Sequence, residues 1–279
     1  ELVGPYLDEC GFFSLENGGG AHFHVAMLAN MTYPFSEARA WNTFAPKTLK
    51  QILVRSTNVL GYSPQPRGLM RLTGEMICDN YHIIRCFDFL NHVENMRPLA
   101  EVVMSRRDVV FEPAVSLSWA RGFTVDHYLE VVAAMIRLCG EVGGLGERET
   151  ENQIILGLKD MAGVCPPRFI SALVQALHKR WPALVLHYHR HATDGLFVPA
   201  VGAAAAAGAH IVDVNLGASA RAYGQGDALA TATYIEEELG LPVHLNRDVA
   251  RTANYVLKQV IPYYDRYCAP YFQGTDNDV

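Results

Sequence analysis

The sequence has no basic run, no paired cysteines and no long apolar segment. Its 23 Lys and Arg against 29 Asp and Glu give a formal net charge of -6, which argues against nucleic acid as a partner. The six Cys are scattered, a pattern typical of reduced thiols in a cytoplasm-like compartment. No apolar run reaches the roughly 18 residues that a membrane span needs. The first residues resemble neither a signal peptide nor a starting Met, so we expect the chain to be cut at that end.

The composition supplies enough apolar material for one large core. The chain has 279 residues, of which 50% are hydrophobic, and its mean hydropathy is +0.06. A single α/β barrel of roughly 250 residues is a natural use of this length.

Short β-type runs alternate with helical patterns along most of the chain. We predict strands at residues 11–16, 49–55, 82–88, 109–117, 153–161, 183–191 and 210–216. We predict helices at residues 21–31, 124–139, 166–179, 194–209 and 227–239. This alternation favours a parallel sheet, and the nearly continuous apolar runs indicate strands that are buried on both faces.

The predicted fold class is therefore α/β, a TIM (β/α)₈ barrel with a C-terminal helical extension. Seven strands are predicted, one fewer than a closed barrel has, and the absent first strand would precede Glu1. Residues 1–245 would form the barrel, and residues 246–279 an incomplete helical extension.

Three histidines share one predicted strand near its end. His187, His189 and His191 alternate along the strand, so their side chains point to the same face. Two imidazoles at positions i and i+2 can bind one metal ion. The alternative is a set of core or surface histidines, but three of them at the end of one strand favour a metal site.

Lys159 lies in GLKDMAG among apolar strand residues, so we expect its side chain to point into the barrel mouth. Burial lowers the pKa of a Lys, and a neutral amine can react with carbon dioxide to give a carbamate, which is an anionic oxygen ligand. A Lys paired with a carboxylate would be the favoured interpretation if Lys159 stood alone.

Two further strand ends carry charged residues. Arg55 ends the strand at 49–55, where an Arg can bind a substrate carboxylate bidentately, and a structural ion pair is the alternative. Asp88 ends the strand at 82–88 and would orient Arg55 or Arg85. For Asp88 we favour the structural role.

Five segments, in this order, resemble the carboxyltransferase domain of pyruvate carboxylase and of its wider family, which includes the oxaloacetate decarboxylase α subunit and the transcarboxylase large subunit. The matching segments are SLENGGGAHFHVAM (14–27), QILVRSTNVLGY (51–62), IRCFDFLNHVENMR (84–97), GLKDMAG (157–163) and HYHRHATDG (187–195). The resemblance runs in register from Phe12 to about Val279. Five motifs in order are far more specific than any one alone.

The resemblance implies a metal-dependent enzyme on a (β/α)₈ barrel with a C-terminal helical extension. In that family the Lys of the KDMAG motif is carbamylated and binds metal together with the two His of an HxH motif. These ligands correspond to Lys159, His189 and His191. The divalent metal is usually zinc, manganese or cobalt. The family moves a carboxyl group between biotin and pyruvate, and the metal polarises the keto oxygen.

The resemblance also implies a substrate site. The Arg of the family's LLRG motif binds the carboxylate of the 2-oxo acid and corresponds to Arg55. The GGA loop that lines the substrate corresponds to Gly19, Gly20 and Ala21. The predicted substrate-binding set is completed by Asp88 and Gln225.

The chain departs from the family pattern where the family handles biotin. The family's catalytic Thr, held to move the proton between biotin and the enolate, corresponds to Tyr223. The Trp before the GGA loop is Gly18, and the family's HTHD has become HRHA, with Ala192 in place of the acidic residue. The AMKM sequence that carries biotin is absent, so any biotin arrives on a separate carrier domain or subunit. The family's Asp metal ligand and a substrate-contacting Gln would precede Glu1.

Three functions remain in view. The first is a metal-dependent carboxyltransferase or decarboxylase that acts on a small 2-oxo acid of the pyruvate or oxaloacetate type, with Tyr223 as proton donor. The second is a biotin-independent lyase or aldolase of the same superfamily, such as hydroxymethylglutaryl-CoA lyase. The third is a catalytically inactive barrel used as a scaffold, against which the intact Lys159, His189 and His191 argue. We expect a cytoplasmic homodimer.

Overall fold

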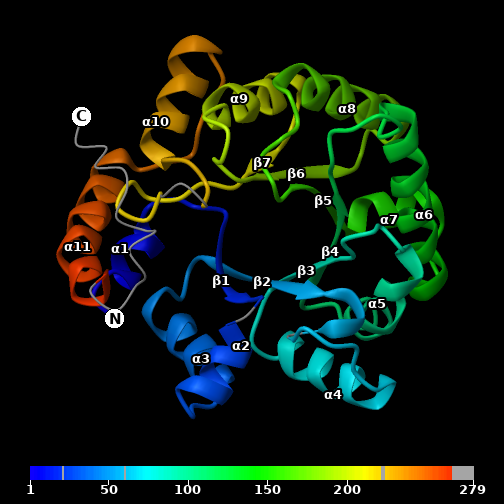
Figure 1. The fold of residues 1–279 in the computed structure, drawn as a ribbon, viewed down its shortest axis with the longest axis horizontal. Coiled ribbons are helices and arrows are strands. Elements are labelled where there is room, and N and C mark those ends of the chain that lie inside the picture. The colour runs from blue at the N-terminus through cyan, green and yellow to red at the C-terminus, as the bar shows by residue number, and fades with distance from the viewer. Residues whose placement is uncertain (21, 60, 221–223, 266–279) are drawn as a thin grey trace.

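A curled parallel sheet forms the centre of the molecule. The computed structural model describes residues 1–20, 22–59, 61–220 and 224–265. Seven strands follow one another in chain order, each paired in parallel with the next. Helices cover the outer face of this sheet (Figure 1). The predicted α/β barrel-type fold is confirmed.

The strands lie close to the predicted positions. Their bounds are β1 Ser14–Gly19, β2 Leu49–Arg55, β3 Ile83–Phe87, β4 Val110–Ser116, β5 Ile155–Asp160, β6 Val185–Arg190 and β7 Ile211–Val212. The last strand is much shorter than predicted. Its pairing with β6 ends after Val212, because the backbone of Asn215 bonds instead to Gly226 and Ala228.

Helices fill the connections between the strands. Their bounds are α1 Gly4–Glu9, α2 His22–His24, α3 Pro34–Phe44, α4 Arg67–Cys78, α5 Arg97–Val103, α6 Val125–Gly143, α7 Glu147–Gln153, α8 Pro167–Arg180, α9 Phe197–Ala207, α10 Ala228–Thr233 and α11 Arg247–Asp265. The predicted helix at 21–31 is α2 followed by a π-helical turn at Val25–Ala29, and the one at 227–239 is α10 followed by another at Tyr234–Glu238.

The main hydrophobic core lies between the sheet and the outer helices. It includes strand residues such as Ile84 and Leu158 and helix residues such as Ile170. The Ala-rich helix α9 packs closely on its neighbour: a Cβ atom on Gly202 would lie 2.3 Å from the ring of Tyr234. Within the described residues, no helix is long and apolar enough to span a membrane.

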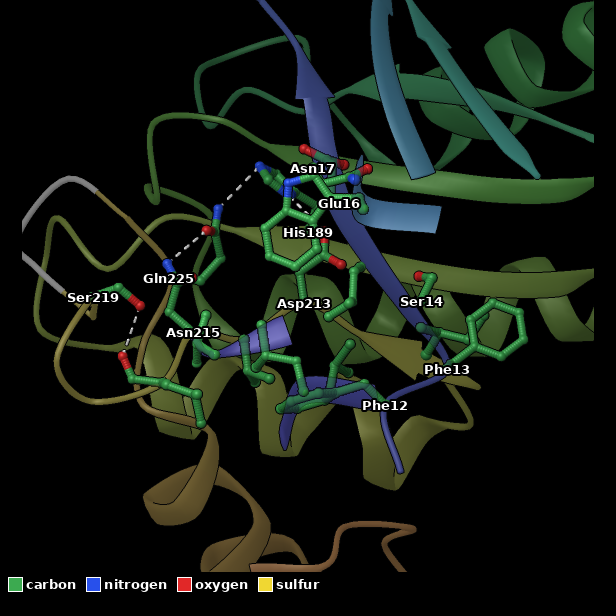
Figure 2. Close-up of a pocket in the computed structure, with 18 of the residues that line it drawn as sticks. Phe12, Phe13, Ser14, Glu16, Asn17, His189, Asp213, Asn215, Ser219 and Gln225 are labelled. Carbon is green, nitrogen blue, oxygen red and sulfur yellow. Dashed lines mark hydrogen bonds and ion pairs between the residues drawn. The ribbon is translucent and has the colours of Figure 1, made fainter. Parts of the chain in front are cut away.

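The two edge strands face each other across a gap. β1 pairs with β2 and β7 pairs with β6, and no strand in the described part of the chain joins β1 to β7. A cavity of about 530 Å³ lies between them, lined by residues of both strands (Figure 2). Outside this gap α1 contacts α11, which is the helix that follows Asn246. Leu7 of α1 and Leu257 of α11 also line the cavity.

Candidate active site

Lys159 and His189 form a cross-strand pair inside the curled sheet. The parallel register of β5 and β6 places the two residues side by side. Lys159 Nζ lies 3.3 Å from His189 Nε2, and both side chains are buried. Each is the last residue but one of its strand, at the carboxyl edge of the sheet, where parallel α/β folds build their active sites. The structure thus brings together two residues that the sequence placed in separate motifs.

Asp213 holds the other nitrogen of His189. The Nδ1 atom of His189 lies 2.6 Å from Asp213 Oδ2, and the pair is visible in Figure 2. Burial, which outweighs the bond to Asp213, lowers the pKa of His189 to about 3. The ring is therefore neutral, and it keeps the proton on Nδ1 and donates it to Asp213, which leaves the Nε2 lone pair facing Lys159. Carboxylate-oriented histidines of this kind are the usual metal ligands.

His191 lies beside this pair, just past the end of β6. Its ring centroid is 5.2 Å from that of His189, and its backbone N–H donates to Asp160 O at 3.2 Å. Across the described ranges, no group of three His, Cys, Asp or Glu side chains is gathered to hold a metal. The groups that lie near one another here are the amine of Lys159 and the imidazoles of His189 and His191, and their role as metal ligands stays a prediction.

The amine of Lys159 has an unusual environment for a cation. Burial is the largest influence and lowers its pKa to about 8, although Glu16 favours the charged form. The ammonium lies 5.1 Å from the centre of the Phe87 ring. With a pKa of about 8, about a tenth of the amine is neutral at pH 7, and this is the form that carbamate chemistry needs.

Arg85 organises the carboxylates below the pair, and sequence reasoning missed this role. Its guanidinium is fully buried and donates to Glu112 at 2.5 Å, to Asp213 at 2.7 Å and to Glu16 at 2.9 Å. His187 lies 3.0 Å from the same guanidinium. Although burial opposes its charged form, Asp213 and Glu112 raise the pKa of His187 to about 9.

This buried network could be only partly read from the sequence. Asp213 follows the apolar run of β7 and Glu112 interrupts that of β4, so polar residues inside strands were the available signal. Which of them meet depends on the curl of the sheet, which brings strands far apart in sequence to face one another. His187, which was not among the predicted metal ligands although it shares their strand face, belongs to this network.

Arg55 lies at the end of β2 with its charge available. Its guanidinium stacks 4.5 Å above the Tyr62 ring, and its Nη1 donates weakly to Gly61 O at 3.4 Å. No carboxylate in the described part of the chain is within ion-pair distance of it. A Cβ atom on Gly20 would lie 3.6 Å from Arg55 Nη2, so the glycine loop borders the guanidinium. This geometry favours anion binding over the structural ion pair.

The glycine loop has a steric origin. Gly19 has φ +117, and a Cβ atom there would lie 2.2 Å from Leu53 O. Only glycine allows β1 to approach β2 so closely. Gln225 lies near His189, with Nε2 3.5 Å from the imidazole Nε2, and it accepts a bond from Asn215 Nδ2 at 3.2 Å. The predicted site residues Ala21 and Tyr223 lie outside the described residues.

Asp88 has a different environment from the other predicted substrate residues. Its buried carboxylate accepts hydrogen bonds from four partners: Ser56 Oγ, Asn95 Nδ2 and the backbone N–H groups of Leu90 and His92. Neither Arg55 nor Arg85 is among these partners. Asp88 therefore shapes the loop after β3, as the structural alternative requires.

The cavity between β1 and β7 reaches this site from the side. His189, Asp213 and Gln225 form its inner wall together with Glu16 and Asn17 of β1 (Figure 2). A register shift between Glu16 and Gly18 makes Asn17 a bulge. Bulges of this kind often stand beside active sites, where they redirect a side chain. These features define a β/α-barrel protein with a polar site at the carboxyl edge of its strands.

Comparisons with known proteins identify the relatives of this barrel. The chain is 32% identical over 221 residues to mitochondrial pyruvate carboxylase of Rattus norvegicus, covering 76% of this chain. Pyruvate carboxylase of Schizosaccharomyces pombe is 31% identical over 220 residues. The chain is a homologue of pyruvate carboxylase. It spans 18% of the length of the rat protein, and no protein-family profile matches it.

Solved structures place the homology in one domain. The carboxyl transferase domain of Rhizobium etli pyruvate carboxylase with 3-bromopyruvate superposes with a TM-score of 0.82 at 26% identity, covering 96% of this chain and 44% of that one. The same domain with oxamate and biotin gives a TM-score of 0.81 at 25% identity, with the same coverage. The chain therefore has the carboxyltransferase-domain fold that the sequence motifs predicted.

Proposed function

We propose that the chain is a metal-dependent carboxyltransferase or decarboxylase acting on a small 2-oxo acid. The observation that carries the proposal is the buried pair of Lys159 and His189, together with Arg55 at the end of β2 on the same edge of the sheet, with no carboxylate of the described residues in ion-pair contact. Lys159 and His189 offer donor atoms for a metal, and Arg55 offers a planar cation for a carboxylate. Homology to pyruvate carboxylase supports the same chemistry.

The residues present fit a divalent metal. His189 offers a neutral Nε2 that Asp213 orients, and Lys159 offers a buried amine of lowered pKa that can become a carbamate. His191 would be the third ligand. When bound, zinc, manganese or cobalt would supply Lewis-acid polarisation of the substrate's keto oxygen.

The chain's own residues would bind and orient the substrate. Arg55 would take the carboxylate in a bidentate contact, with the Gly19–Gly20 loop against it. Gln225, 3.5 Å from His189, would contact the remaining polar atoms of the substrate. Tyr223 would replace the family's Thr as the proton donor. Any biotin would be brought by a carrier domain or subunit.

Replacing Arg55 by Lys should lower kcat/KM for oxaloacetate or pyruvate by roughly 30-fold or more. A bidentate contact in a dry pocket is worth about 2–4 kcal/mol, and the point charge of Lys cannot copy the planar fork. Steady-state kinetics with each 2-oxo acid give the measurement. Arg71→Lys, on the exposed face of α4, is the matched control and should leave the rate unchanged.

A loss of less than about threefold in Arg55→Lys would assign Arg55 to the structure rather than to the substrate. An equal loss in Arg71→Lys would show that the change is not specific to the site.

A further inference from the structure

A second charged pair lies on the other face of the strands that carry Lys159 and His189. The register of β5 and β6 pairs Asp160 with Arg190, one residue beyond the inner pair. Successive side chains on a strand point to opposite faces, so Asp160 and Arg190 point away from the sheet interior. Both are fully buried. Inner and outer pairs are thus built back to back on adjacent residues.

The guanidinium of Arg190 joins the loops that follow the two strands. Nη1 donates to Asp160 Oδ2 at 2.8 Å and to Cys165 O at 2.7 Å. Nη2 donates to Gly163 O at 2.8 Å and to Asp194 Oδ2 at 2.5 Å. Cys165 and Gly163 belong to the loop after β5, whereas Asp194 belongs to the loop after β6. One side chain therefore fixes both loops at once.

The loop held in this way packs directly on His191. Gly163 has φ +64, and a Cβ atom there would lie 2.4 Å from His191 O. Asp160 accepts the N–H groups of Val164 and Cys165 at 3.0 Å each, which closes the loop on the strand end. The backbone of His191 in turn donates to Asp160 O. The loop that Arg190 holds therefore lies against the backbone of His191.

We propose that Arg190 is a positioning residue that fixes His191 relative to Lys159 and His189. The proposal rests on the proposed function, because the positioned groups are its predicted metal ligands. Position 190 is a Thr in the family's HTHD motif, so this chain uses a device that the motif itself does not contain. A Lys at 190 would keep the charge, but its single ammonium could not reach four acceptors spread over two loops.

Cobalt(II) binding measures the effect on the ligands. The chain is titrated with Co²⁺, and the visible absorption of the bound ion is followed in wild type, Arg190→Lys and Arg190→Thr. We expect both variants to bind Co²⁺ about 10-fold more weakly or worse, with a changed spectrum, as for lost partners of metal ligands. Leu177→Ala, which opens a cavity in α8 away from the loops, is the control for a general loss of stability.

A second readout does not depend on metal. The ¹⁵N resonances of the His189 and His191 rings should shift in Arg190→Lys and Arg190→Thr and stay in place in Leu177→Ala. If these resonances are unmoved in the Arg190 variants, or move equally in Leu177→Ala, the positioning role is refuted. If the wild type binds no Co²⁺ but the ring resonances of the Arg190 variants shift, the metal part of the proposed function fails and the positioning role stands.

Discussion

Arg85→Met should destabilise the protein by about 3–5 kcal/mol. The guanidinium is the cation shared by Glu16, Glu112 and Asp213, and removing one partner of a buried ionic network leaves charge uncompensated in a low dielectric. Met keeps most of the volume, so the loss reports charge rather than packing. Urea unfolding at pH 7.5 measures the change in the free energy of unfolding.

A matched control uses an exposed ion pair. Arg106 bonds to Asp79 and Asp108 on the surface, and Arg106→Met should cost no more than about 1 kcal/mol. Lowering the pH to 5.5 should narrow the gap between wild type and Arg85→Met, since protonation neutralises the carboxylates that have lost their cation. Equal costs for the two Arg variants would show that the buried network contributes little to stability.

Tyr223→Phe should slow 2-oxo acid turnover by about 10²–10⁴-fold if Tyr223 donates the proton, the usual range for a general acid. The residue stands where the carboxylases have Thr. The carbonyl of Gly224, a described residue, accepts the N–H of Ala192 at 2.8 Å. Decarboxylation of oxaloacetate, with and without free biotin, is the assay.

Tyr223→Thr separates the alternatives. If Tyr223 only fills the space of the biotin ring, Tyr223→Phe should leave the decarboxylation rate nearly unchanged. Tyr223→Thr should then create or raise biotin-dependent turnover. A surface Tyr would leave both variants at the wild-type rate. If the wild type and both variants are inactive on every 2-oxo acid, the scaffold hypothesis gains and the carboxyltransferase proposal loses.

Most of the fold could be predicted from the sequence because the strands are short apolar runs between clear turns. β2 begins and ends at the predicted residues. Helices α4 and α5 received no prediction, and neither did α7, whose seven residues ERETENQ carry no apolar face for a periodicity argument to use. The length of β7 was overestimated, because the backbone of Asn215 forms hydrogen bonds with Gly226 and Ala228, and no local sequence pattern indicates these contacts.

The site was predictable where a single strand carried the signal. Alternation along β6 places His189 and His191 on one face. Lys159 lies near the end of the neighbouring parallel strand, so it is expected to lie close to them. Arg85 and Asp213 are ordinary charged residues in sequence, and their importance comes from burial at one point of a curled sheet. Long-range contacts of this kind leave no periodic trace.

The central claim is that Lys159, His189 and His191 hold one divalent metal ion, and elemental analysis of the purified protein tests it most directly. In protein that also carries the first strand with the family's Asp ligand, we predict about one zinc, manganese or cobalt ion per chain in the wild type and less than about a tenth of that in the His189→Ala/His191→Ala variant, because ligand loss removes most of the affinity. Asn152→Ala, at an exposed position of α7, should keep the wild-type content. Equal metal content in the wild type and the double variant would contradict the account.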